Sequence, residues 1–117
     1  MAGNDRCLFC RIASGEITAK KVFEDDLAVA FHDINPQAPV HVLIVPRKHI
    51  ASLDEMTEAD NAIVGGVLLR AAQIARDLKL ESDGYRVVVN TGEAAGQTVF
   101  HIHFHILGGR NFSWPPG

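Results

Sequence analysis

Residues 101–107 alternate between polar and apolar side chains, in the order His-Ile-His-Phe-His-Ile-Leu. Successive side chains of a β-strand point to opposite faces, so a strand over 101–107 would place the three histidines on one face. Ile102, Phe104 and Ile106 would then anchor the other face in a core. Histidines two positions apart in a strand are about 7 Å apart, so one ligand could touch two or three of them.

Apolar runs of strand length predict four more strands, over 21–24, 27–31, 40–45 and 85–90. Helical spacing of apolar residues predicts a short helix over 7–14 and a long helix over 57–80. Most connections have the length of hairpins, which favours antiparallel pairing because parallel strands need long crossovers. We therefore expect an α+β fold in which a five-stranded antiparallel sheet packs with one long and one short helix, in a single domain over 1–117.

The long helix has a recognisable start and an unusual interior. Thr57 and Asp60 have the spacing of an N-terminal capping box. Gly65 and Gly66 lie inside the helix, where each glycine costs about 1 kcal/mol relative to alanine. We interpret this pair as a place where another backbone comes close, with poor helix propensity that is merely tolerated as the alternative.

Charge and composition limit the class of protein. The net charge of −3 argues against a dedicated nucleic-acid binder. No apolar run reaches the roughly 18 residues that would suggest a membrane span, and residues 1–6 lack the apolar stretch of a secretory signal. Two cysteines are too few for a disulfide framework. We expect a cytoplasmic protein without nucleic-acid or membrane partners, in which residues 1–6 are flexible.

Three histidines on one strand face have three interpretations. They can bind a metal through neutral imidazoles, supply a nucleophile with two helper groups, or form a solvated face. The first would make the protein a metal-dependent hydrolase, but no Asp or Glu lies in or just behind the triplet. The preceding loop, residues 90–98, offers backbone amides, the Gln97 amide and the Thr98 hydroxyl as donors for phosphate oxygens.

The segment 97–107 resembles the signature of the histidine triad superfamily, His-φ-His-φ-His-φ-φ, in which φ is apolar. Segments 31–39 and 46–50, and the Trp-Pro-Pro-Gly ending at 114–117, are similar to the Hint branch of that superfamily. The resemblance runs in order from about residue 7 to the end. It implies a homodimer whose two sheets join into one, with the tail 110–117 near the dimer interface.

The resemblance also implies an activity, the hydrolysis of purine nucleoside phosphoramidates and aminoacyl-adenylates through a nucleotidyl-histidine, with no cofactor needed for catalysis. The resemblance makes the middle histidine the nucleophile, which is His103 here. A neutral imidazole with a pKa near 6.5 is a good nucleophile at pH 7, so this role is chemically reasonable. His105 and Thr98 would contact the phosphate and assist the leaving amine, although family members commonly have serine at the position of Thr98. His101 and His49 would support the orientation of the nucleophile.

By the same resemblance, a purine nucleotide of the AMP or GMP type would lie in an apolar slot. Asp33 would accept hydrogen bonds from the ribose, and Trp114 would lie near the partner's site. Core packing is the alternative for the apolar members of this set, and a turn is the alternative for Asp33. The expected nucleotide contacts are Leu8, Phe9, Ile12, Phe31, Asp33, Ile34, Asn90, Gly96, Gln97, Thr98, His103, His105 and Trp114.

Cys7 and Cys10 form a CxxC pair that is open to three interpretations: a redox pair, half of a zinc site, or two small buried residues. The redox interpretation lacks its βαβ context, and zinc needs two more ligands. Some histidine triad proteins bind zinc through such a pair and the histidines that match His49 and His101. The resemblance therefore adds a candidate structural zinc site of Cys7, Cys10, His49 and His101.

Two histidines and two other functions complete the expectations. Neither His32 nor His41 belongs to a motif that indicates a function, and we interpret both as structural. A dinucleoside polyphosphate hydrolase is an alternative activity, although that branch lacks the Trp-Pro-Pro-Gly ending. A nucleotide-binding scaffold with incidental catalysis is a second alternative, against which the intact His103, His105 and Thr98 argue.

Overall fold

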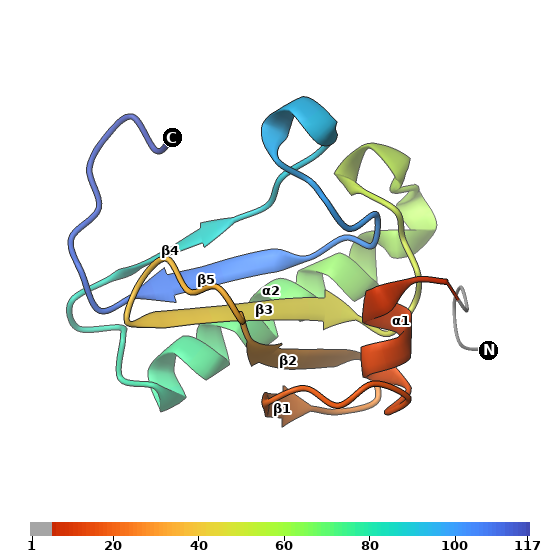
Figure 1. Ribbon diagram of the computed structural model, residues 1–117, viewed down its shortest axis with the longest axis horizontal. Coiled ribbons are helices and arrows are strands. Elements are labelled where there is room, and N and C mark those ends of the chain that lie inside the picture. Colours follow the sequence, from red (N-terminus) through yellow and green to blue (C-terminus); the bar gives the residue numbers. More distant parts are fainter. Residues whose placement is uncertain (1–5) are drawn as a thin grey trace.

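A computed structural model describes residues 6–117, so the expected flexible segment 1–6 lies, apart from Arg6, outside the described residues. Five strands form one antiparallel sheet in the order β1-β2-β3-β5-β4 (Figure 1). Both the α+β class and the five-stranded antiparallel sheet are confirmed. The strands are β1 (Lys21–Glu24), β2 (Ala28–His32), β3 (Val40–Pro46), β4 (Tyr85–Val88) and β5 (Phe104–Gly108).

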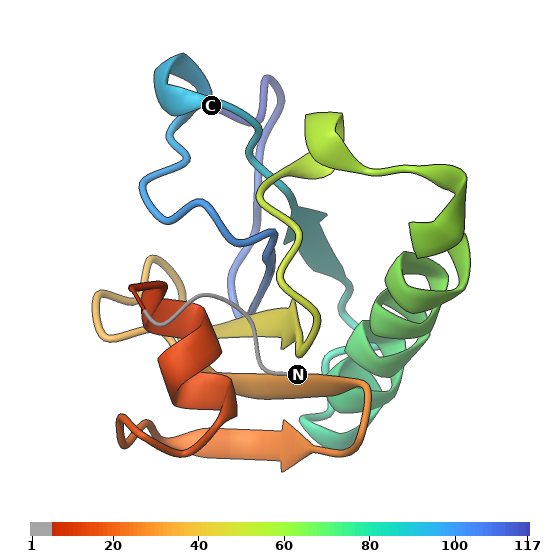
Figure 2. The same ribbon diagram turned by 90° about the vertical axis from the view of Figure 1, so that its right-hand side faces the viewer.

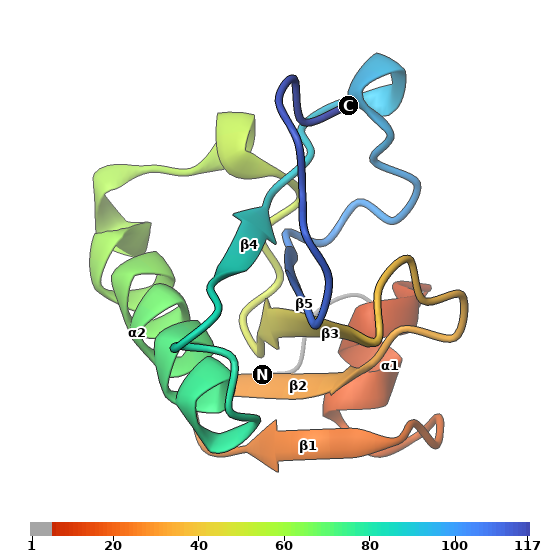
Figure 3. The same ribbon diagram turned by 90° about the vertical axis from the view of Figure 1, so that its left-hand side faces the viewer.

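Two α-helices, α1 (Leu8–Ala13) and α2 (Asn61–Asp77), cover opposite faces of this sheet (Figures 2 and 3). The even-numbered apolar residues of 28–31 and 42–45 pack with α2 in one core. The odd-numbered residues of the same stretches pack with α1 in a second core. This division follows from the two-residue period of a strand, and it explains why β3 is apolar on both faces.

The long helix is shorter than the sequence predicts. Residues 58–60 form a separate 3₁₀ turn, η2, and α2 itself begins at Asn61 and ends at Asp77. The predicted start signal is nevertheless real, because the backbone N–H of Thr57 donates to Oδ2 of Asp60 over 3.0 Å in a capping box. The capping box therefore begins the 3₁₀ turn, and the α-helix follows from it.

The two glycines of α2 have different surroundings. A Cβ atom on Gly66 would lie 2.6 Å from Cδ2 of Leu27 and 3.2 Å from Nη1 of Arg70. Gly65 has no such neighbour within 4 Å. The group that approaches Gly66 within this chain is therefore a side chain before β2, and the expectation of another backbone is corrected at that position.

The last strand begins three residues later than predicted, at Phe104 and not at His101. The N–H of Ile102 donates to the carbonyl oxygen of Ile50 over 2.6 Å, which ties residues 101–103 to the segment after β3 and not to the sheet. The alternation still holds, because Ile102, Phe104 and Ile106 all lie in the α2 core. The other predicted helix and strand limits agree with the structure to within two residues, apart from the long helix.

The sheet order leaves β4 at one edge, and the C-terminal tail lies against it. The ring of Phe112 lies 5.0 Å from the guanidinium carbon of Arg86 and 4.2 Å from that of Arg110. Arg86 also donates from Nη2 to the carbonyl oxygen of Ser113. The joining of two sheets across a dimer stays a prediction. Within residues 6–117, no helix has both the length and the apolar character needed to cross a membrane.

Candidate active site

His103 lies just before β5 and is 7% exposed. Its Nδ1 atom is 2.8 Å from the carbonyl oxygen of His101, which can only accept, so Nδ1 carries a proton and donates it. The Nε2 atom of the neutral ring then carries the lone pair. Burial lowers the pKa of His103, although the hydrogen bond to His101 and the charge of Asp33 act in the opposite direction. The ring is therefore neutral at pH 7, with its nucleophilic nitrogen defined.

A second set of hydrogen bonds fixes the proton on His105. The backbone N–H of Gln37 donates to Nδ1 of His41 over 3.0 Å, so neutral His41 carries its proton on Nε2. That Nε2 atom lies 2.9 Å from Nδ1 of His105 and donates to it. Neutral His105 consequently carries its own proton on Nε2. Among the described residues, this buried Nε2 atom has no hydrogen-bond partner, which leaves a donor available to a ligand.

Both catalytic candidates lie side by side and are held neutral. The ring centroids of His103 and His105 are 5.2 Å apart. Burial, with smaller contributions from the nearby His103 and His41, lowers the pKa of His105 to about 4. Burial also lowers the pKa of His41, although the charge of Asp33 opposes this shift. One ring thus offers a lone pair and its neighbour offers an N–H group, a pairing suited to attack at a phosphorus atom whose oxygens need a donor.

His41 was interpreted as structural from the sequence, and its contact with His105 corrects that interpretation. Leu43 of β3 is paired with His105 of β5, and His41 lies two residues before Leu43 on the same face. His41 and His105 are therefore diagonal neighbours across the two strands. The register between β3 and β5 carries this information, and no local motif around His41 does.

Asp33 makes the turn interaction that was the alternative to ribose binding, and its second carboxylate oxygen lies near His41. Its Oδ1 atom accepts the backbone N–H of Asn35 over 2.8 Å, which is the turn interaction. Its Oδ2 atom lies 3.4 Å from Nε2 of His41. The negative charge of Asp33 also acts to raise the pKa values of His103 and His105. The carboxylate thus faces the histidines, and its contact with a ribose stays a prediction.

The apolar residues expected around the base divide into two groups. Three of them are buried in the core on the α1 side of the sheet: Phe9, Ile12 and Phe31. Core packing, the alternative to ligand contact, is thus what the structure shows for these three. Phe9 also meets the His103 ring edge to face, with centroids 4.9 Å apart. Leu8 is 43% exposed, and Ile34 is 101% exposed in the loop after β2. The side chains available to a ligand are therefore Leu8 and Ile34, with Phe9 behind them against the nucleophile.

Gln97 has a different role from the one expected. Its side-chain Nε2 donates to the carbonyl oxygens of Ala51 and Val99, at 2.8 and 3.2 Å, and its Oε1 accepts the N–H of Gly92. Its own backbone N–H donates to the carbonyl oxygen of Gly92. The predicted use of the Gln97 amide as a phosphate donor is corrected, because this amide holds the loop in place.

The other predicted contacts of the loop are Asn90, Gly96 and Thr98. The 3₁₀ turn η3 (Glu93–Ala95) ends at Gly96, whose φ of +97° is the left-handed conformation that favours glycine. A Cβ atom at Gly96 would lie 3.8 Å from Nδ2 of Asn90, so these two predicted contacts are neighbours. Thr98 is exposed. No sequence pattern indicates a role for Thr91, whose hydroxyl is buried without a hydrogen-bond partner among the described residues.

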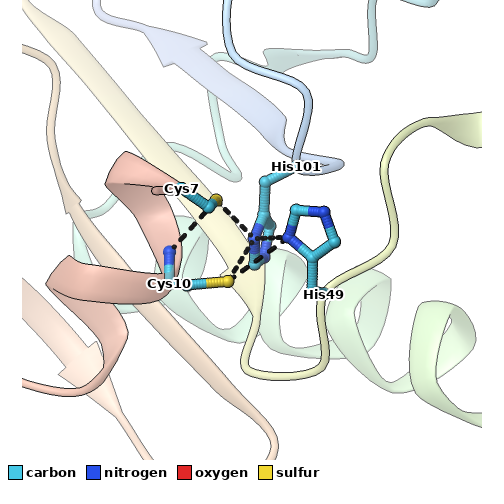
Figure 4. Close-up of side chains that lie close together, drawn as sticks. All are labelled: Cys7, Cys10, His49 and His101. Atoms are coloured by element: carbon cyan, nitrogen blue, oxygen red, sulfur yellow. Dashed lines mark hydrogen bonds between the residues drawn. The ribbon is translucent and has the colours of Figure 1, made fainter. Parts of the chain in front are cut away.

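One sulfur or nitrogen atom from each of four residues converges on a single point (Figure 4). The residues are Cys7, Cys10, His49 and His101. Nδ1 of His101 lies 3.3 Å from Sγ of Cys7 and 3.4 Å from Sγ of Cys10. Nδ1 of His49 lies 3.3 Å from Sγ of Cys10 and 3.2 Å from Nδ1 of His101. A tetrahedral zinc site with ligand distances of about 2.3 Å to sulfur and about 2.1 Å to nitrogen has edges of about 3.3–3.8 Å. The four residues therefore fit a zinc ion.

Local structure explains how these four ligands meet. Cys7 caps the N-terminus of α1, where its Sγ accepts the N–H of Cys10 over 3.3 Å. His101 donates from Nε2 to the carbonyl oxygen of Pro46, at the end of β3, which leaves Nδ1 unprotonated and directed at the sulfur atoms. Burial, the largest cause, lowers the pKa of His101 to about 4, so its ring is a neutral ligand at pH 7.

A groove of about 470 Å³ runs past this cluster. Its wall includes Cys7 and His49 from the cluster, together with Leu8 and Thr98 from the predicted nucleotide contacts. Trp114 lies apart from these residues along the chain, in the tail that follows β5, and is 83% exposed. Its expected place near a partner's nucleotide stays a prediction.

The HIT domain family model matches residues 14–112, a range that holds the three triad histidines together with Asp33, His41 and His49. The chain belongs to the HIT domain family. An uncharacterized HIT-like protein of Synechocystis sp. is 54% identical over 110 residues, which is 94% of this chain and 96% of the relative.

Solved structures agree with this membership of the HIT family. A HIT family hydrolase from Legionella pneumophila superimposes with a TM-score of 0.94 at 50% identity, covering 96% of this chain and 100% of that one. A histidine triad nucleotide-binding protein from Candida albicans has a TM-score of 0.80 at 33% identity, covering 95% of this chain and 84% of that one. The superfamily expected from the histidine pattern is therefore confirmed.

Proposed function

We propose that this HIT family protein is a hydrolase that cleaves purine nucleoside phosphoramidates, with AMP-amines and aminoacyl-adenylates as its substrate class. One observation carries the proposal: the ring of His103, with its lone pair on Nε2, lies 5.2 Å from the ring of His105 between centroids, and the buried Nε2–H of His105 has no partner among the described residues. The Legionella pneumophila relative is described as a hydrolase and the Candida albicans relative as nucleotide-binding, and both descriptions support this choice.

The reaction proceeds in two displacements at phosphorus. Nε2 of His103 attacks the phosphorus atom of an AMP-amine, and the bond from phosphorus to the amine nitrogen breaks as that nitrogen takes up a proton from solvent, which the water of the second step gives back. The products of this step are a free amine and AMP bound to His103. Water then attacks the same phosphorus atom, the bond to His103 breaks, and AMP leaves. The net change is one water consumed for each amine and AMP formed.

Donors around the phosphorus stabilise the charge that develops on its oxygens. The Nε2–H of His105 is one such donor, because it is already oriented and has no competing partner among the described residues. The hydroxyl of Thr98 and the backbone near Gly96 are the other candidates. In this proposal Asp33 accepts hydrogen bonds from the ribose, and its contact with His41, over 3.4 Å from Oδ2 to Nε2, supports that role by keeping the carboxylate near the histidines.

We also propose that Cys7, Cys10, His49 and His101 hold a structural zinc ion. All four ligands come from the protein, so the ion would cross-link the chain and have no open position for substrate. That catalysis needs no cofactor stays a prediction. A kcat that persists in excess chelator at saturating substrate would exclude the alternative in which the triad itself binds a catalytic metal.

The test of the nucleophile is intact-protein mass spectrometry during turnover of AMP-tryptamine. The reaction is quenched in alkaline denaturant, because a bond from phosphorus to histidine is labile in acid. An adduct of one AMP is expected in the wild type and in His32→Ala, whose histidine is exposed and outside the site. The adduct and turnover should both be absent in His103→Ala. Turnover that survives in His103→Ala would overturn the assignment.

The two alternative functions are separated by different measurements. The ratio of kcat/KM for AMP-tryptamine to kcat/KM for diadenosine tetraphosphate should exceed one by orders of magnitude, and a reversed ratio would favour the polyphosphate hydrolase. A cellular phenotype that His103→Ala leaves unchanged while it abolishes turnover would favour the scaffold.

A further inference from the structure

We infer that the four-residue cluster of Cys7, Cys10, His49 and His101 controls nucleotide affinity, so that metal and nucleotide bind cooperatively. Cys7 and Cys10 are, in this view, positioning residues of the nucleotide site that act through the metal. The inference rests on the proposed function, because it needs a nucleotide site. It does not depend on how the nucleotide is hydrolysed.

The first connection passes through His101, which belongs to both sites. Its imidazole Nδ1 lies in the cluster, and its backbone carbonyl accepts the proton on Nδ1 of His103. The neighbouring residue, Ile102, is hydrogen-bonded to Ile50, which follows His49 in the chain. Fixing the rings of His101 and His49 on one ion therefore fixes the backbone that orients the nucleophile.

The second connection passes through α1. This helix has only six residues, Leu8–Ala13, and a helix of that length is not stable by itself in water. Cys7 caps it and Cys10 lies in its first turn, so both thiols sit at the end of the helix that carries Leu8 and Phe9. The Phe9 ring meets His103 at a centroid distance of 4.9 Å. A metal would thus cross-link this wall of the predicted nucleotide slot to His101.

The third connection is the groove beside the cluster. Cys7 and His49 line the same groove as Leu8 and Thr98, which are two of the predicted nucleotide contacts. Groups that bind the metal and groups that would bind the nucleotide are thus neighbours in one wall. Any movement of α1 away from the segment at 98–100 would change both sets of contacts together.

Physical chemistry gives the direction of the effect. Without a metal, sulfur–nitrogen hydrogen bonds, which are weak, join the thiols of the cluster to its imidazoles. Structural zinc contributes directly to the folding free energy of its site. Metal binding thus orders α1 and residues 101–103 before the nucleotide arrives. Thermodynamic linkage then requires AMP to tighten metal binding by the same factor by which the metal tightens AMP binding.

The experiment measures both halves of this linkage in wild-type protein. AMP is titrated calorimetrically into zinc-loaded protein and into protein stripped with a chelator, and zinc affinity is measured by competition with a chromophoric chelator, with and without saturating AMP. We expect AMP to bind at least about fivefold more tightly to the zinc-loaded form, and zinc affinity to rise by the same factor. AMP affinities within twofold of each other at full zinc occupancy would overturn the inference, as would a failure to bind zinc.

Variants and a spectroscopic readout keep the test decisive. Cys10→Ala should bind AMP with the affinity of stripped wild type whether or not zinc is present, while His32→Ala should retain the full zinc effect. If Cys10→Ala does not fold, Co²⁺ substituted in the wild type decides instead: AMP should raise Co²⁺ affinity, read from the visible absorption of a tetrahedral site, and an unchanged affinity would overturn the inference. Zinc-loaded protein that binds no AMP would contradict the proposed function itself, whereas AMP that binds and is hydrolysed without linkage would contradict only this coupling.

Discussion

The Nε2 atom of His41 lies 2.9 Å from the Nδ1 atom of His105, across the pairing of β3 with β5. Because the N–H of Gln37 occupies Nδ1 of His41, the proton shared by the two rings belongs to His41. This single contact decides that His105 presents an N–H group, and not a lone pair, to the substrate. A histidine outside the triad thereby sets the chemistry of one inside it.

His41→Ala should consequently lower kcat by roughly tenfold or more, since removing one oriented hydrogen-bond donor to the developing charge costs about 10²–10³ in kcat and here the donor loses only its orientation. AMP affinity should change less than kcat. His41→Gln should recover part of the loss, because its side-chain N–H₂ can still donate to Nδ1 of His105. The measurement is steady-state kinetics with AMP-tryptamine, and a wild-type kcat in His41→Ala would rule out this role.

The acidic limb of the pH–rate profile should lie below the ordinary pKa of histidine. The nucleophile must be neutral, and burial lowers the pKa of His103 below its ordinary value of 6.5. The pKa of His105 is lowered further, to about 4. Thus kcat/KM should fall to half of its plateau value only below pH 6.5. A half-maximal rate at or above pH 6.5 would show that the free enzyme does not hold His103 neutral in this way.

The free energy of unfolding should also decrease as the pH is lowered. In the unfolded chain His105 takes up a proton near pH 6.5, whereas in the folded chain it does so only near pH 4, so between these values the unfolded state binds more protons. The stability that depends on neutral His105 is therefore fully present above about pH 6.5 and is lost as the pH falls toward 4. Urea midpoints at pH 7.5 and pH 5.0 measure this loss. His105→Gln should flatten the dependence, and an unchanged slope would assign it to other groups.

The sequence predicts the sheet and the triad because both rest on short-range periodicity. Alternation over 101–107 identifies which residues enter the α2 core, and Ile102, Phe104 and Ile106 are all found there. It fails at the limit of the strand, because Ile102 pairs with Ile50 instead of a neighbouring strand. That choice depends on the path of the chain after β3, which no local pattern contains.

The difference between local patterns and long-range contacts also explains which parts of the site the sequence does not predict. The cluster of Cys7, Cys10, His49 and His101 could be anticipated only because a family resemblance supplied its long-range pairing. The role of His41 needs the register of β3 against β5, and nothing near His41 in the sequence indicates it. Gln97 was misassigned because an amide in a glycine-rich loop has the same donors whether it faces a phosphate or a carbonyl oxygen of the chain.

Gln97→Ala should therefore destabilise the fold more than it impairs chemistry. The variant would leave the carbonyl oxygens of Ala51 and Val99 and the N–H of Gly92 without the partner they have in a buried position. An unsatisfied buried polar group costs about 1–3 kcal/mol. Denaturant unfolding measures this cost, with Thr98→Ala, an exposed neighbour, as the control. Unfolding unchanged in Gln97→Ala would return Gln97 to the list of phosphate ligands.

The glycine pair of α2 offers a matched comparison. Both Gly65→Ala and Gly66→Ala should gain about 0.5–1 kcal/mol of helix propensity. Only the Gly66 variant meets an obstacle, because its Cβ would lie 2.6 Å from Cδ2 of Leu27 and 3.2 Å from Nη1 of Arg70. Overpacking of this kind costs about 1–3 kcal/mol, so Gly66→Ala should be less stable than Gly65→Ala by about that amount.

Unfolding of the two variants at several protein concentrations completes this comparison. Within the chain Gly65 has open space around it, so Gly65→Ala should be more stable than the wild type at every concentration. If Gly65→Ala is instead destabilised, and the loss grows with dilution, a second copy of the chain packs against Gly65. The backbone expected near the glycine pair would then be that of the second chain. A Cβ at Gly65 would push the two chains apart and weaken their association, so the loss of stability would grow with dilution.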